Sequence, residues 1–132
     1  MYQSSRYAIT ESMSEILNEF GELFIKQVRD NSISILEKTI RGEMRAPADQ
    51  ELHRKISSLS NAEIEILKET AYRMVDLTLH NMLFMFEQSK AWVIANPKEG
   101  VQSLSELSDG LAGELYTSDG WIQQFSGYPS SL

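Results

Sequence analysis

One stretch of the chain places acidic, basic and imidazole side chains at helical spacing. Glu69, Arg73, Asp76, His80 and Glu87 follow one another at intervals of 4, 3, 4 and 7 residues, so in a helix they form one narrow polar seam. A carboxylate near a histidine orients and retunes its imidazole, which suits acid–base catalysis. Ordinary ion pairs along the wet edge of a helix produce the same pattern. This structural interpretation is the simpler one, so we predict no catalytic residue and treat the seam as a candidate for binding.

The same residues are poorly spaced for a metal ion. His80 and Glu87 lie two helical turns apart, about 10 Å along the axis, and neither a His-x-x-His nor a Glu-x-x-His spacing occurs. The chain has no cysteine, which excludes disulfides, thiolate ligands and cysteine nucleophiles. It also has no glycine-rich phosphate loop and no Gly-x-Ser-x-Gly elbow. The sequence therefore predicts no metal and no cofactor, and it favours a non-enzymatic protein over an enzyme.

A second group of candidates lies in the segment 113–121, where glycine, acidic and aromatic residues gather. Recognition sites often lie in such loop-rich stretches, and aromatic residues often anchor interfaces. An aromatic plug at the end of the core explains the same residues without any binding function. Combined with the seam, the candidate binding residues are Asp76, His80, Glu87, Glu114, Tyr116, Asp119 and Trp121.

The net charge of −7 lies mostly in the second half of the chain. Residues 61–132 contain four Lys or Arg and ten Asp or Glu, and from Glu99 onward there is no Lys or Arg at all. Nucleic acids require clustered cations, so we do not expect nucleic-acid binding. The acidic third suits a basic protein partner, although acidity also serves solubility alone.

The seam needs a long helix, and a clear signal marks where that helix begins. Ser60 and Glu63 have the capping-box spacing, and Leu59 and Ile64 stand at the positions of a hydrophobic staple. No Gly or Pro interrupts the pattern until about residue 88, which predicts a central helix of about 60–88, some 42 Å long.

The second half of this helix is apolar on nearly all sides. The run 74–86 contains few polar residues and three methionines, Met74, Met82 and Met85. A helix that is hydrophobic all round is one that other elements surround. We therefore expect residues 74–86 to be buried on most sides and the methionines to fill the core.

The N-terminal part reads as an amphipathic helix over 8–29, with Gly21 as a weak point that costs up to about 1 kcal/mol relative to alanine. Asp30, Asn31 and Ser32 are able to cap a second helix, and one bent helix over 8–41 is the alternative. In either case Gly42 ends the helical stretch, and Pro47 precedes a short helix of roughly 48–57.

After Ser89 the helical pattern of apolar residues ends, and short apolar runs alternate with turn residues. An aromatic and β-branched run, a turn at 96–100 and a second apolar run predict a small β-hairpin over about 91–104. Ser108-Asp109-Gly110 recurs as Ser118-Asp119-Gly120, so we expect a Ser or Asp to cap each of two short helices. The tail 128–132 is expected to fray.

These elements predict a mainly α, compact helical domain over residues 1–127. The longest apolar run, 82–86, is far shorter than the ~20 residues of a membrane span, and the first residues do not resemble a secretory signal. We therefore expect a cytoplasmic protein without membrane contact.

The order of the features also carries a resemblance. The segments 59–64, 79–83, 86–87, 113–116 and 120–121 hold the capping box, His80, Glu87, Tyr116 and Trp121 in turn. This order resembles small bacterial protein families of unknown function, in which a long helix with His and Glu precedes a loop-rich cap. The resemblance covers roughly residues 52–126. It implies a bacterial cytoplasmic setting, and it assigns no reaction and no functional residue.

Three functional hypotheses follow. The first is a non-enzymatic protein-interaction module, immunity- or adaptor-like, whose acidic C-terminal third meets a basic partner. The alternative is a small-ligand-binding protein or an enzyme, with a pocket between the central helix and the C-terminal cap that uses Asp76, His80, Glu87 and Glu114. A third is a homodimer that associates through helix 8–29.

Overall fold

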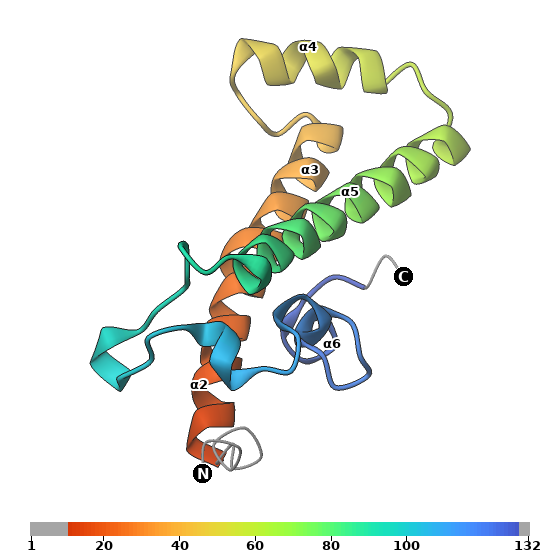
Figure 1. The fold of residues 1–132 in the computed structure, drawn as a ribbon. Coiled ribbons are helices and arrows are strands. Elements are labelled where there is room, and N and C mark those ends of the chain that lie inside the picture. The colour runs from red at the N-terminus through yellow and green to blue at the C-terminus, as the bar shows by residue number, and fades with distance from the viewer. Residues whose placement is uncertain (1–10, 130–132) are drawn as a thin grey trace.

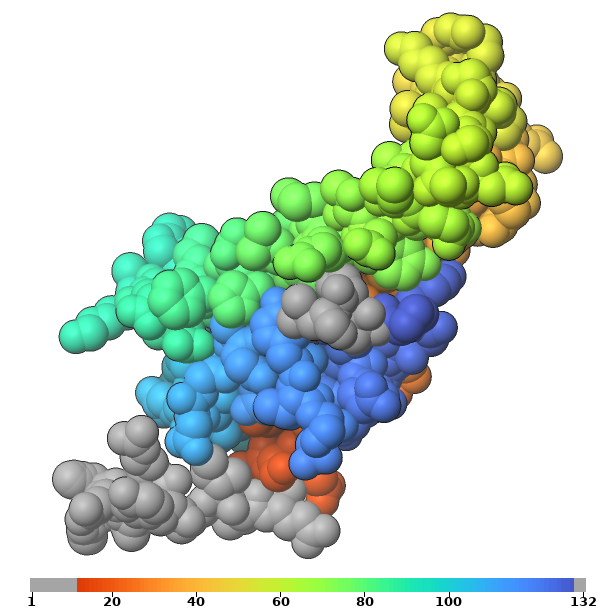
Figure 2. Space-filling view, turned by 90° about the vertical axis from the view of Figure 1, so that its right-hand side faces the viewer, coloured from red at the N-terminus to blue at the C-terminus, as the bar shows by residue number. Residues whose placement is uncertain are grey.

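The computed structural model describes residues 11–129, and this part of the chain is helical and contains no β-strand. Figure 1 shows a long N-terminal rod, a short helix across one of its ends, and a second long helix that runs back across the rod. The C-terminal segments fill the angle between the two long elements, and Figure 2 shows them directly beneath the long helix. The predicted mainly α fold with a long central helix is confirmed.

The N-terminal rod is one continuous helical stretch within the described residues, made of α2 (Glu11–Phe24), a π-helical segment η1 (Ile25–Asp30) and α3 (Asn31–Arg41). Asp30 and Asn31 both have α-helical backbone angles, and the Asp30 side chain makes no capping hydrogen bond. The one-helix alternative is therefore correct for residues 11–41, and residues 8–10 lie outside the described part. Gly42 ends the rod in the left-handed conformation, at φ 77°, as predicted.

The next two helices begin where the sequence indicates. Pro47 is the first residue of α4 (Pro47–Ile56). Ser60 caps α5 (Asn61–Gln88), with the Glu63 amide donating to Ser60 Oγ at 3.1 Å and the Ser60 amide donating to Glu63 Oε1 at 2.8 Å. The capping box and the extent of the central helix are confirmed.

The prediction that residues 74–86 are surrounded is wrong. Only Asp76, Leu79 and Leu83 of α5 are buried, because the rod and the C-terminal segments pack against a single side of the helix. Met74, Met82 and Met85 are all exposed, so the expectation that the methionines fill the core is wrong as well.

The predicted β-hairpin is also wrong. The segment after α5 contains one isolated antiparallel bridge, between Asn96 and Val101, around the 3-10 helix η2 (Pro97–Glu99). The turn at 96–100 is thus present, with Gly100 at φ 74°, whereas the flanking residues do not continue as paired strands. A lone two-stranded hairpin is only marginally stable, and Trp92 and Val93 at its base are exposed.

The C-terminal cap, residues 104–129, contains the 3-10 helices η3 (Leu104–Leu107) and η4 (Leu111–Leu115) and the short helix α6 (Trp121–Phe125). The prediction of short C-terminal helices is confirmed, whereas the prediction that a Ser or Asp caps each of them is wrong. Gly110 and Gly120 occupy the N-cap positions of η4 and α6, and neither helix has a side-chain cap. Backbone crowding explains Gly120, since a Cβ there would lie 2.8 Å from the Leu115 carbonyl oxygen.

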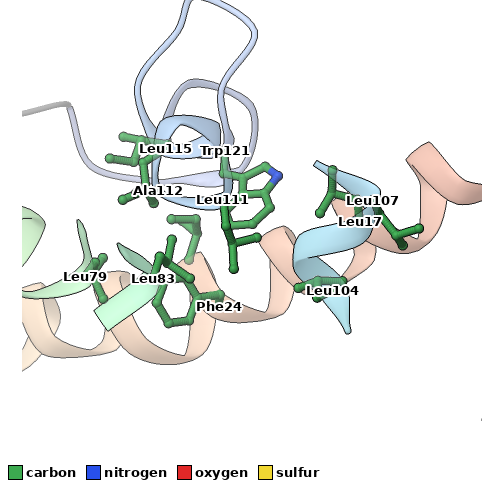
Figure 3. Packing of buried hydrophobic residues seen from close by; sticks show 12 residues of the cluster. Leu17, Phe24, Leu79, Leu83, Leu104, Leu107, Leu111, Ala112, Leu115 and Trp121 are labelled. Carbon is green, nitrogen blue, oxygen red and sulfur yellow. The ribbon is translucent and has the colours of Figure 1, made fainter. Parts of the chain in front are cut away.

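The core lies where the cap meets the rod and α5 (Figure 3). Its buried members are Leu17, Phe24, Ile25, Leu79, Leu83, Leu104, Leu107, Leu111, Ala112, Leu115, Trp121 and Ile122. Trp121 meets Phe20 and Phe24 edge-on, with ring centroids 5.7 and 6.5 Å apart. Its indole also covers Gly21, where a Cβ would lie 2.4 Å from the ring. Gly21 is therefore the residue that makes room for the indole.

Candidate functional site

A buried ion pair joins the predicted seam to the N-terminal rod. Asp76 of α5 accepts two hydrogen bonds from Arg29 of η1, from Nε to Oδ1 at 2.6 Å and from Nη2 to Oδ2 at 3.2 Å. The Arg29 and Asp76 side chains are 0% and 4% exposed. Two parallel bonds of this kind are the strongest arrangement for an arginine and a carboxylate.

The remaining Arg29 donors hold the end of the chain. Nη1 donates to Ser126 Oγ at 2.7 Å and to the Tyr128 carbonyl at 3.1 Å, and Nη2 donates to the Pro129 carbonyl at 3.0 Å. Together with the two bonds to Asp76, these satisfy all five N–H groups of the guanidinium. The chain is thus fixed to the rod as far as Pro129, while residues 130–132 lie outside the described part.

Asp30, the neighbour of Arg29, also contacts this segment. Its carboxylate accepts from Ser126 Oγ at 2.5 Å and from the Gly127 amide at 2.8 Å. Arg29 and Ile25 are the buried residues of the π-helical segment, in which hydrogen bonds that span five residues widen the turn. Arg29 was not among the residues predicted from the sequence, although it stands four residues after Ile25 and therefore shares a helix face with an apolar residue.

Glu87, the last residue of the seam, contacts the cap, and so does the backbone of Asp76. Glu87 Oε1 accepts from the Ala112 amide at 3.1 Å, at the start of η4. Tyr116 Oη donates to the Asp76 carbonyl at 3.4 Å, and burial, followed by the negative charge of Asp76, raises the pKa of Tyr116. Glu69 and Arg73, at the far end of the seam, are exposed.

His80 lies half-buried between two aromatic rings, with centroids 5.7 Å from Tyr116 and 6.2 Å from Phe84. Its Nδ1 is buried and has no hydrogen-bond partner among residues 11–129. No carboxylate is bonded to this imidazole in the same part of the chain, so the residues that share its seam do not form the dyad that acid–base catalysis uses.

Glu114 and Asp119 lie apart from the seam, at a hollow of about 360 Å³ between α2 and the cap. Glu114 Oε2 accepts from Ser108 Oγ at 2.6 Å, and Asp119 is exposed. A third carboxylate, that of Asp109, lines the same hollow. The two Ser-Asp-Gly segments thus bring their aspartates to one place.

Trp121 is buried in the core, and its Nε1 donates to Asn18 Oδ1 at 3.2 Å. The predicted candidates therefore separate into three groups: Asp76, His80, Glu87 and Tyr116 between α5 and the cap, Glu114 and Asp119 at the acidic hollow, and Trp121 in the core.

The first group is occupied by internal contacts. Asp76 binds Arg29, Glu87 binds the Ala112 amide, and the Tyr116 ring packs on His80. Within residues 11–129 no three His, Asp or Glu side chains are placed so that they could hold a metal ion. None of the helices in this part is long and apolar enough to cross a membrane.

Comparison with known proteins gives no relative: no family model, no curated protein and no solved structure matches the chain. The resemblance to small bacterial families therefore stays a prediction.

Proposed function

We propose that the protein is a non-enzymatic interaction module that binds a basic segment of a partner protein at the acidic hollow. One observation carries the proposal: Asp109, Glu114 and Asp119 line a concave site in which the other described lining residues are uncharged. Those residues are Ser14, Leu17, Asn18, Leu107, Ser108 and Gln124.

The charge around the hollow supports a cationic ligand. Asp109 and Asp119 are exposed, and neither forms an ion pair with another residue of the described part. The sequence from residue 99 onward also contains no Lys or Arg. A lysine or arginine side chain that enters the hollow gains charge-assisted hydrogen bonds, and the surrounding negative field accelerates the encounter.

The test measures binding of a lysine-rich peptide by calorimetry at low and at moderate salt. We expect binding that weakens with salt, because exposed charges are screened. The double variant Asp109→Asn/Asp119→Asn should bind about thirtyfold more weakly, since two lost charged contacts of about 1 kcal/mol each sum to about 2 kcal/mol.

A matched control separates the hollow from the overall charge. Glu99→Gln/Glu106→Gln also removes two negative charges, but from nearby exposed positions that do not line the hollow. This variant should bind the peptide as the unmodified chain does. Equal losses in both double variants, or no binding at all, would contradict the proposal.

A second candidate is small-ligand binding, although at a different place from the one predicted. A hollow of about 640 Å³ lies between α2 and the segment after α5, with an apolar wall that includes Phe20, Leu23, Ile94 and Leu104. Its size is typical of small-molecule sites. An apolar fluorescent probe should bind there, and Ala95→Trp, which fills the hollow, should abolish the signal. An unchanged signal would count against this candidate.

A further inference from the structure

The exposed side of α5 carries no charge over its C-terminal half. Between Met74 and Gln88 every exposed residue of the helix is uncharged, whereas Asp76 turns toward Arg29 of the rod and both His80 and Glu87 turn toward the cap. We call this surface the outer face of α5. It consists of Met74, Leu77, Thr78, Asn81, Met82, Phe84, Met85 and Gln88.

The outer face is large for a surface that remains in water. Its five apolar side chains are between 39% and 54% exposed. At roughly 100 Å² each they present about 500 Å² of apolar area, as much as the largest patch on a typical monomer, and such patches usually mark interaction sites. Long apolar side chains with three methionines among them adapt well to a second surface.

The absence of charge selects the kind of partner. Two copies of a chain with a net charge of −7 repel each other, and an uncharged face is where they approach with the least repulsion. A basic partner would instead find no carboxylate on this face between Met74 and Gln88.

Six of the eight residues of the outer face match one another when one helix is reversed, while Phe84 and Gln88 fall opposite Val75 and Ala71. About a midpoint between Leu79 and His80, Met74 pairs with Met85, Leu77 with Met82, and Thr78 with Asn81. Every apolar residue in these pairs meets an apolar residue, and the two polar ones meet each other. A two-fold interface requires this kind of self-complementarity.

We propose that two copies of the chain form an antiparallel dimer through the outer faces of their α5 helices. This pairing also brings the N-terminal half of one helix alongside the segment that follows Gln88 in the other. Ile66, 67% exposed and five full turns from Phe84, lies on the same side of α5. Trp92 and Val93, 74% and 43% exposed, follow Gln88.

The available area is sufficient for a stable dimer. With Ile66, Trp92 and Val93 included, the apolar area rises to about 800 Å² per copy, which is the contribution of each partner to an interface of standard size. This interface uses a different surface from the acidic hollow, so Asp109→Asn/Asp119→Asn should leave the dimer intact.

The first test is the mass of the full chain in solution, measured by light scattering over a range of concentrations. We expect about twice the chain mass of 15.0 kDa. Leu77→Glu/Met85→Glu places two charges on each outer face and should give the mass of one chain, with an unchanged helical circular dichroism spectrum because both positions are exposed. The matched control is Leu23→Glu on α2, which is 58% exposed and does not belong to the outer face; it should remain dimeric.

The second test determines whether the two helices pair in antiparallel fashion. Because the sequence contains no cysteine, an introduced cysteine is the only thiol of each chain. Met74→Cys and Met85→Cys chains should form a disulfide-linked dimer only when they are mixed. In an antiparallel pair a cysteine and its own copy lie about 16 Å apart along the axis, too far for a disulfide. Cross-linking of either variant with itself would overturn the antiparallel arrangement.

Three results would overturn the proposal as a whole. One is a chain that stays monomeric at about 100 μM, far above the dissociation constants of specific interfaces. Another is a dimer that survives Leu77→Glu/Met85→Glu and dissociates with Leu23→Glu, which would place the interface on the N-terminal rod. The last is a monomer that floats with phosphatidylcholine vesicles through the outer face, which would assign that face to a lipid surface.

Discussion

Replacing Asp76 with leucine removes the carboxylate and leaves the guanidinium of Arg29 buried beside an apolar side chain. Removing one partner of a buried ion pair typically costs 3–5 kcal/mol, because the remaining charge is neither hydrated nor paired. Arg29 keeps its bonds to Ser126, Tyr128 and Pro129, so we expect a loss near the lower limit, about 3 kcal/mol. That is a large part of the 5–15 kcal/mol that stabilises a typical domain.

The double variant Arg29→Leu/Asp76→Leu provides the control. It removes both charges at once, and the cost that remains comes from the carbonyls of Tyr128 and Pro129 that lose their donor. We expect about 2 kcal/mol for the double variant, since each unpaired buried group costs about 1–3 kcal/mol and this segment is only partly buried. The double variant should therefore be more stable than Asp76→Leu alone.

The assay is urea unfolding followed by circular dichroism, with the free energy of unfolding extrapolated to water. For a chain of this length, Asp76→Leu should lower the Tm by about 10 °C. A loss below about 1 kcal/mol would refute the reasoning, since that is the value of an exposed pair. A loss in the double variant equal to the sum of the losses in Arg29→Leu and Asp76→Leu would refute it equally, because residues in direct contact should show a coupling energy.

Three further predictions follow from other parts of the fold. Gly21→Ala should destabilise the chain by about 1–3 kcal/mol through overpacking against Trp121, although alanine is the better helix former; a gain in Tm would contradict the packing. Burial and a hydrogen bond to Glu37 raise the pKa of Tyr72 to about 12, so its stabilising effect should be complete below pH 10 and decline between pH 10 and about 12. An ultraviolet titration of the Tyr72→Phe variant should lack this late step, and a titration identical to that of the unmodified chain would be inconsistent with it. His80→Leu should change the free energy of unfolding by less than about 1 kcal/mol or raise it, because the buried Nδ1 has no described partner to lose; a urea midpoint far below that of the unmodified chain would show a missing contact.

Local signals predicted the helices well. The capping box at Ser60, the left-handed Gly42 and Pro47 at the first position of α4 all depend on groups within a few residues of each other. Such interactions are encoded in adjacent sequence, so the start of α5 and the breaks around α4 were predictable without knowledge of the tertiary structure.

Features that depend on distant groups were not predictable in this way. Asp30 does not cap a second helix, and its carboxylate instead accepts from Ser126 and Gly127, 96 and 97 positions away. Likewise, the sequence indicates Gly21 only as a weak point in a helix. The reason for a glycine there is the indole of Trp121, which comes from a distant part of the chain. The seam residues were found because their spacing is regular, but their partners Arg29 and Ala112 come from other elements.

The exposed apolar half of α5 shows a different limit. Hydrophobicity on all sides of a helix predicts that every side is covered, and it does not say whether the cover comes from the same chain. Here the single chain covers only the side with Leu79 and Leu83. The prediction of burial was wrong for one copy, and it would hold for α5 in the proposed dimer.

The bonds from Arg29 to Tyr128 and Pro129 also constrain the order in which the molecule folds. They close a loop of 99 to 100 residues, and closing so long a loop is entropically unfavourable until other contacts have brought its ends together. The capped helix α5 and the rod form from near neighbours, whereas the guanidinium finds its last acceptors only after the cap has packed. Arg29 is therefore a late-forming contact, and its loss should mainly accelerate unfolding while leaving the folding rate nearly unchanged.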